Sequence, residues 1–147
     1  MNVHQHGLQH SIITHLRALT GLTVIWQYGG VKLPASTPFI TVEQMQNNNA
    51  ILTKQREAVQ SIYRFQIGYF ASSANDRARR QDVIKRSLIF DTIEYLDTDR
   101  SPAQADGFFR CELTAEEPFN AEGIEDISQY HRVYFDVEID TVMRAKR

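Results

Sequence analysis

Two long stretches of alternating residues constrain this chain more than any other feature of its sequence. From Val59 to Phe70, aromatic and aliphatic side chains alternate with arginine, glutamine and glycine. From Tyr130 to Asp140, valine, phenylalanine and isoleucine alternate with tyrosine and acidic residues. A period of two is typical of a β-strand that buries one face and exposes the other. Both stretches are therefore predicted to be strands of a sheet with one covered face.

Shorter patterns predict the other elements. Apolar residues at helical spacing predict a first helix over 3–19, which Thr20-Gly21 ends, and a second over 74–89 after a cap at Ser72-Ser73. The apolar stripe of the first helix is Leu8, Ile12, Leu16 and Leu19, and that of the second is Ala74, Ala78, Ile84 and Leu88. Further strands are predicted at Leu22–Trp26, Phe39–Met45, Thr92–Leu96 and Gly107–Thr114.

The order of these elements predicts the fold class. Helix, three strands, helix, three strands is the order of an α+β domain, and most sequential strands are close enough along the chain to pair antiparallel. We expect one domain over residues 1–147, with two layers: a mostly antiparallel sheet covered on one face by two helices. No linker separates two cores.

Composition narrows the class of protein. The 16 Lys and Arg residues nearly balance 18 Asp and Glu, for a net charge of −2, which disfavours duplex and sequence-specific nucleic-acid binding. One cysteine, Cys111, cannot form an intramolecular disulfide, which fits synthesis in a reducing cytoplasm. The longest stretch without a charged residue or a histidine, Ala18–Val31, is too short and too rich in glycine to cross a bilayer. We expect a soluble product without a membrane partner.

Candidate catalytic and metal-binding patterns are weak. His6 and His10, at i and i+4, supply only two ligands, and no acidic residue or cysteine in their helix completes a zinc site. Asp97-Thr-Asp99 begins like a calcium loop but lacks its later ligands, so a turn is predicted. A Cys111–His131 couple would need neighbouring strands. We therefore predict no enzyme activity, no catalytic or metal-binding residue and no cofactor; a small metal-dependent enzyme is the alternative.

Two oppositely charged segments suggest a contact between copies of the chain. The loop predicted over 115–128 is acidic, whereas the second helix is rich in arginine. An acidic segment of one subunit that meets a basic helix of the next makes a head-to-tail contact, and such contacts close into rings. The predicted interface residues are Arg77, Arg80, Arg86, Glu116, Glu117, Glu125 and Asp126.

The segment between the second and third predicted strands is the candidate partner-binding element. Residues 46–57 are too polar for a core strand and too long for a tight hairpin turn, so they are predicted to project as an arm. Within this arm the apolar pair Ile51-Leu52 stands beside Lys54 and Arg56. We expect the arm to order against a partner and to bury the apolar pair there.

The chain resembles the tail completion proteins of long-tailed bacteriophages, also called tail terminator or tail-to-head joining proteins. The resemblance is carried by "LTGLTVIWQYGG", "LPASTPFITVEQ", "YRFQIGYFASSANDRARRQDVIKRSL", "DGFFRCELT" and "HRVYFDVEID", in that order from about Leu8 to Asp140. It implies a structural virion protein, assembled in the host cytoplasm. A homohexameric ring would cap the tail tube, bind the tube protein and the head–tail connector, and let DNA pass. The alternative is another neck, head-completion or minor tail protein.

Overall fold

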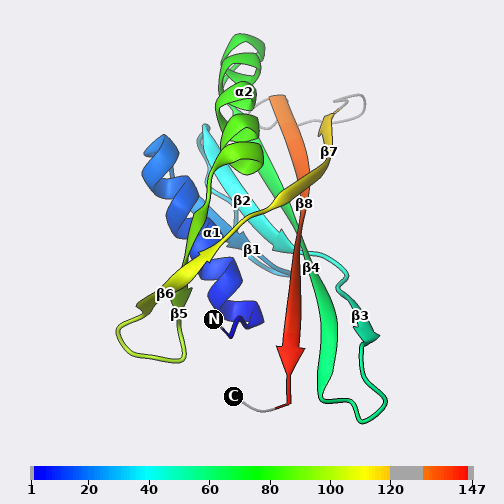
Figure 1. Ribbon diagram of the computed structural model, residues 1–147. Coiled ribbons are helices and arrows are strands. Elements are labelled where there is room, and N and C mark those ends of the chain that lie inside the picture. Colours follow the sequence, from blue (N-terminus) through cyan, green and yellow to red (C-terminus); the bar gives the residue numbers. More distant parts are fainter. Residues whose placement is uncertain (1, 120–130, 146–147) are drawn as a thin grey trace.

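The computed structural model describes residues 2–119 and 131–145 (Figure 1). Two helices and eight strands follow one another along this part of the chain. They are α1 (Gln5–Thr20), β1 (Val24–Gln27), β2 (Phe39–Gln44), β3 (Asn48–Ile51), β4 (Ala58–Ala71), α2 (Ala74–Phe90), β5 (Ile93–Asp97), β6 (Gln104–Phe109), β7 (Glu112–Pro118) and β8 (His131–Arg144). In the described residues, neither helix is both long and apolar enough to span a membrane.

The α+β fold predicted from the sequence, with a mostly antiparallel sheet, is confirmed. The main sheet has the order β1-β2-β4-β8-β7, and β3 pairs with Val59–Ile62 near the start of β4. All its pairs are antiparallel except β1 with β2, which is parallel. β1 can pair in parallel because the long connection over 28–38 returns the chain to the same end of the sheet before β2 begins.

The two alternating stretches form the central pair of strands. β4 and β8 pair over their full length, from Ala58↔Arg144 to Ala71↔His131. β8 is longer than predicted because Thr141–Arg144, which no longer alternate cleanly, continue the ladder beside the start of β4. The prediction of one strand over Gly107–Thr114 was wrong: the chain bends at Arg110 and Cys111, so that β6 pairs with β5 in a separate small sheet and β7 pairs with β8.

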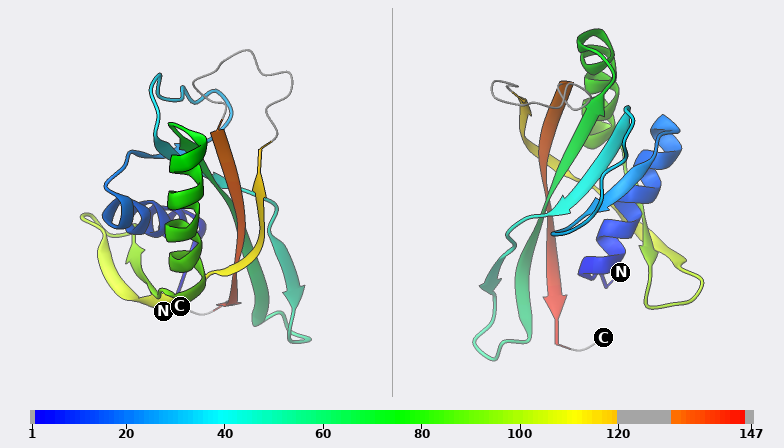
Figure 2. Two further views of the ribbon diagram at one scale, coloured as in Figure 1. Left: turned by 90° about the horizontal axis from the view of Figure 1, so that it is seen from above. Right: turned by 180° about the vertical axis from the view of Figure 1, so that it is seen from behind.

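Both helices cover the same face of the main sheet (Figure 2). α1 ends at Gly21, whose φ of 69° places it in the left-handed conformation that glycine favours. Ser73 caps α2 by accepting the N–H of Asp76. The core lies between these helices and the odd-numbered side chains of β4 and β8. It includes Leu8, Ile12, Leu16, Ile84, Leu88, Phe65, Ile67, Tyr69, Phe135 and Val137.

The apolar stripes predicted for the two helices include residues at helix ends that extend past the sheet, and these residues are exposed instead of buried. Leu19 is 37% exposed, and Ala74 and Ala78 are exposed because the first half of α2 extends past the strands (Figure 1). The opposite face of the sheet is polar and forms ladders across β4 and β8. Arg64 pairs with Glu138 at 3.1 Å, and the Gln66 amide donates to Asp136 at 3.1 Å.

Candidate functional site

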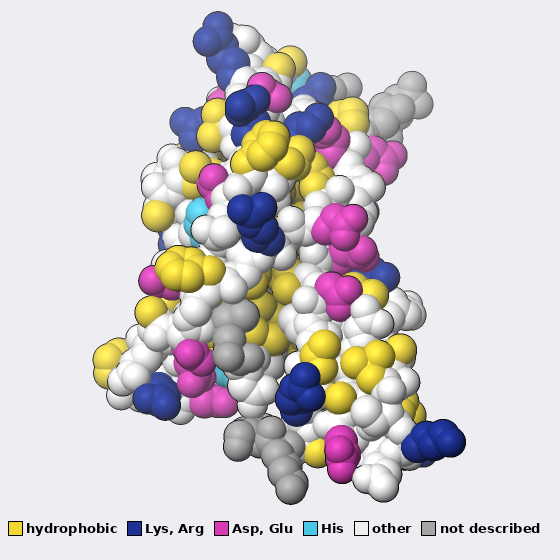
Figure 3. Space-filling model, in the orientation of Figure 1, with side chains coloured by type: hydrophobic (Ala, Val, Ile, Leu, Met, Phe, Trp, Pro, Cys, Tyr) yellow, Lys and Arg dark blue, Asp and Glu magenta, His cyan; other side chains and the backbone are white. Residues whose placement is uncertain are grey.

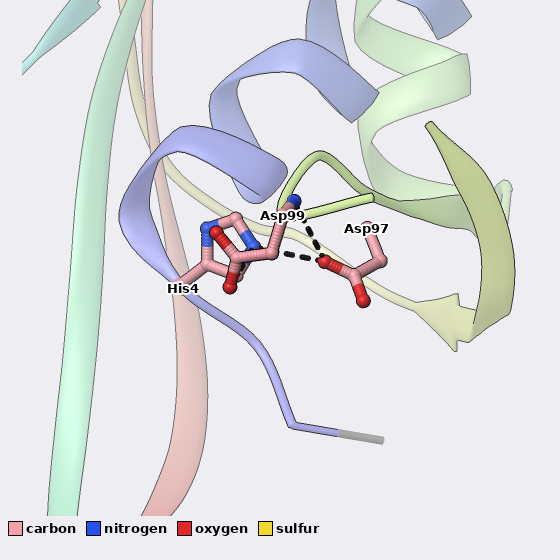
Figure 4. A group of neighbouring side chains, drawn as sticks. All are labelled: His4, Asp97 and Asp99. Atoms are coloured by element: carbon pink, nitrogen blue, oxygen red, sulfur yellow. Dashed lines mark hydrogen bonds and ion pairs between the residues drawn. The ribbon is translucent and has the colours of Figure 1, made fainter. Parts of the chain in front are cut away.

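The structure brings together a histidine and two aspartates that are more than ninety residues apart in sequence (Figure 4). His4 caps α1, because its Nδ1 accepts the backbone N–H of Gly7 at 3.1 Å. Its Nε2 lies 3.2 Å from Oδ1 of Asp97 and 3.5 Å from Oδ2 of Asp99. The backbone N–H of His4 donates to the hydroxyl of Tyr95 at 3.1 Å. The imidazole therefore fastens the start of α1 to the end of β5.

The hydrogen bonds of His4 determine which ring nitrogen carries the proton. A backbone N–H can only donate, so Nδ1 must accept, and the neutral ring then holds its proton on Nε2. That proton points at Asp97. A metal ion on Nε2 would force a proton onto Nδ1, directly against the N–H of Gly7. Although one ligand atom from each of the three side chains lies within 4.8 Å of the others, this geometry favours a hydrogen-bonded latch over a metal site.

Asp97 also forms the turn that the sequence predicts there. Its Oδ1 accepts the N–H of Asp99 at 3.0 Å, and Arg100 lies 3.5 Å from its Oδ2. The Asp99 N–H, followed by the His4 imidazole, lowers the pKa of the Asp97 carboxyl. The carboxylate thus stays ionised as the acceptor of the latch.

His6 and His10 lie side by side on α1, as the helical spacing predicts. Their rings stack with centroids 6.5 Å apart, and Trp26 meets His6 edge-on. His6 Nδ1 also lies 2.7 Å from the hydroxyl of Thr98. Burial, helped by His6 and Arg17, lowers the pKa of His10. Within the described ranges, no acidic or cysteine side chain joins this pair to form a group of three metal ligands.

Cys111 and His131 are far apart, so the couple considered from the sequence does not form. Cys111 precedes Glu112, which pairs with Glu138, whereas His131 begins β8. Along the direction of β8, the two residues are separated by roughly eight strand residues, or about 26 Å. Cys111 is buried, and burial raises the pKa of its thiol to about 12. It packs as a small core residue.

The oppositely charged segments meet within one chain. Glu116 forms an ion pair with Lys85 of α2 and accepts a hydrogen bond from Gln81 at 2.8 Å. This contact arises because residues 112–118 form strand β7 beside α2, where the sequence predicted the acidic loop from Ala115 onwards. Glu117 is exposed on β7. Glu125 and Asp126 lie outside the described residues.

The three arginines predicted at the interface lie on α2 but differ in their contacts. Arg80 lies 3.3 Å from Asp76 one turn earlier, and Arg86 lies over the ring of Phe90 at 5.7 Å from its centroid. Arg77 is half-buried and forms no ion pair with another described side chain. The role of these residues in joining subunits stays a prediction.

The predicted arm is a β-hairpin rather than an irregular segment. β3 pairs with the start of β4, and residues 52–57 form the turn between them. The hairpin reaches past both helices (Figures 1 and 2). Ile51 and Leu52 are 57% and 52% exposed, and Lys54 and Arg56 are exposed beside them. All four residues predicted to bind a partner are therefore accessible in the single chain.

No protein-family model matches the chain, and no curated protein matches it.

Proposed function

We propose that this protein is a structural subunit of a bacteriophage tail that acts as a tail terminator. In this role it forms a ring, expected to be a homohexamer, at the head-proximal end of the tail. There it binds the tail tube protein on one side and the head–tail connector on the other. The observation that carries the proposal is the projecting β-hairpin arm with its exposed apolar tip.

The arm has the properties of a binding element. Two large apolar side chains, Ile51 and Leu52, stand next to each other on a hairpin that is covered by neither helix. Lone exposed apolar residues are common, but adjacent ones on a projecting element favour burial against a partner. Burying both could supply about 3–6 kcal/mol before the cost of ordering is subtracted.

A structural role also fits what the reactive side chains do. His4 holds α1 to β5, and Cys111 is a buried thiol with a raised pKa. Both stabilise the fold where they are, and neither needs a substrate to explain its contacts. The same arm would equally suit another neck or minor tail protein, so the position of the protein in the particle is the deciding observation.

The experiment uses a phage whose genome encodes this chain. Deleting the coding sequence should give heads and tails that do not join, and the intact gene supplied in trans should restore joined particles. Gold-labelled antibody should then mark the head-proximal tail end in electron micrographs. Normal particles without the gene, or label at another station, would contradict the proposal.

A charge reversal tests the predicted contact between subunits. Arg77→Glu combined with Arg80→Glu should weaken self-association without unfolding the protein. Partly exposed charges and their ion pairs contribute at most about 1 kcal/mol to folding, whereas like charges that meet across an interface repel. Lys32→Glu, on an exposed residue outside both α2 and the β8 groove, is the matched control. Sedimentation velocity measures the association. Equal association of the double variant and the control would show that α2 lies outside the contact.

A further inference from the structure

β8 has a neighbouring strand on each side over only part of its length. β4 pairs with all of it, but the β7 ladder runs only from Pro118↔Val133 to Glu112↔Glu138. Before Glu112 the chain turns away into β6, which pairs with β5. Among the described residues, therefore, no strand lies against the β7 side of β8 from Ile139 to Arg144.

Three residues point their backbone polar groups out of this open edge. Successive residues of a strand direct their N–H and C=O groups to opposite sides. The N–H of Ala145 donates to Glu57 on the β4 side, and the C=O of Arg132 accepts from Phe119 on the β7 side. Odd-numbered residues of β8 thus bond to β4, and Asp140, Val142 and Arg144 face outwards. An open row of this kind is a template for an added strand.

A groove runs along the same edge. It is lined by residues 139–142 of β8, by residues 108–110 and by Val3. A second hollow, which shares Val3, continues the groove to Met143. Phe108 and Met143 are 62% and 46% exposed, and Figure 3 shows hydrophobic side chains gathered over this end of the sheet. The groove thus combines apolar side chains with the polar side chains of Arg110, Asp140 and Thr141, so it can take an added strand of mixed composition such as Asn48–Ile51.

The other side of this end of the sheet is open as well. β3 pairs only with β4, and its four residues are exposed. Leu52 N–H donates to Ala58, so even-numbered residues face β4, and Asn49 and Ile51 point their backbone groups outwards. The registers align one row, Ala50–Gln60–Val142, from the β3 edge to the β8 edge. The three-stranded end β3-β4-β8 therefore has two free edges.

We infer that the open edge of β8 at Asp140–Arg144 binds strand β3 of a second copy of this chain. β3 and β8 are both antiparallel to β4, so a copy related by rotation about an axis along the strands adds its β3 parallel to β8. Ile51 of the incoming arm then lies in the groove near Phe108 and Met143. Each such contact pairs the free β3 edge of one copy with the free β8 edge of the next. The inference rests on the self-assembly in the proposed function and names the surfaces that meet.

Disulfide trapping between two singly substituted proteins tests this contact. One carries Val142→Cys and the other Ala50→Cys; Asn48→Cys, on the same face, covers a register shifted by two residues. Within one chain these positions are separated by β4, about 9.5 Å across two strand spacings, which is too far for a disulfide. Native Cys111 is buried, and its raised thiol pKa keeps it protonated and unreactive in this experiment.

Mixing the Val142→Cys protein with an arm variant under mild oxidation should give a disulfide-linked heterodimer in preference to either homodimer. Val142→Pro removes an outward N–H without touching the β4 ladder, and should lower the association constant by about tenfold or more. Val142→Ala, which keeps the N–H, is the matched control. Absence of the mixed dimer at up to millimolar protein, or equal association of the proline and alanine variants, overturns the inference.

The phage experiment separates this inference from the proposed function. A mixed dimer from a protein that is missing from assembled tails would refute the tail function and leave the contact standing. Normal joining of heads and tails by the Val142→Pro protein would refute the contact and leave the tail function standing.

Discussion

Replacing His4 tests whether one imidazole both caps α1 and latches it to β5. His4→Ala removes the acceptor for the N–H of Gly7 and the donor to Asp97. His4→Asn removes the latch, but asparagine is among the best N-cap residues and keeps an acceptor for Gly7. Losing a cap costs about 1 kcal/mol. For a chain of this size we expect His4→Ala to melt about 2–4 °C below His4→Asn, and His4→Asn to melt slightly below the natural protein.

The natural protein, His4→Ala and His4→Asn also distinguish a hydrogen-bonded latch at His4 from a metal site. Thermal melts are repeated with zinc and with a chelator. Because Nδ1 faces a donor, we expect zinc to change none of the melting temperatures. A ligand that binds only the folded state at a hundred times its Kd would add about 2.7 kcal/mol. A zinc-dependent rise of that size in the natural protein, absent from His4→Asn, would show that Nε2 binds metal and does not carry the proton.

Three further predictions concern the arm, the α1 packing and pH. Ile51→Ser with Leu52→Ser should leave the melting temperature nearly unchanged, since both are exposed, yet reduce joining of tails to heads in complementation; a large drop in melting temperature would place them in the subunit core. Gly7→Ala improves helix propensity by about 1 kcal/mol, but its Cβ would lie 2.8 Å from the ring of buried Tyr95, so urea denaturation should show a net loss of about 1 kcal/mol. Burial opposes ionisation of Asp76, but hydrogen bonds, first from Tyr69, outweigh it and lower its pKa. Stability should therefore fall as pH drops below about 4, and Asp76→Asn should flatten that dependence in acid melts.

The long strands and the helices could be predicted because their signal is local. Alternation in β4 and β8 reports burial on one face directly, and Gly21 and Ser73 supply the helix ends. β3 was missed because its sequence, Asn48–Ile51, has no strand-like pattern. It forms because β4 extends beyond β2 and offers a free edge there. Tertiary pairing thus overrides local propensity.

The contacts around the candidate sites could not be predicted because they join distant parts of the chain. Nothing in the spacing of His4 and Asp97 indicates that the cap of α1 meets the end of β5. The ion pair of Lys85 with Glu116 depends on β7 lying beside α2, which required the bend after Phe109. That residues 46–57 project as an arm could be predicted, because their polarity excludes them from the core whether or not they pair with another strand.

The central strand pair also determines how the molecule bears force. β4 and β8 share a continuous ladder of fourteen residues per strand, which spans roughly 46 Å. Tension applied along the strands loads all the hydrogen bonds of that ladder together, whereas tension that separates the strands at one end breaks them one after another. The protein should therefore be stiffest along its sheet axis and should fail first when peeled apart, from the arm end, where no helix backs the ladder.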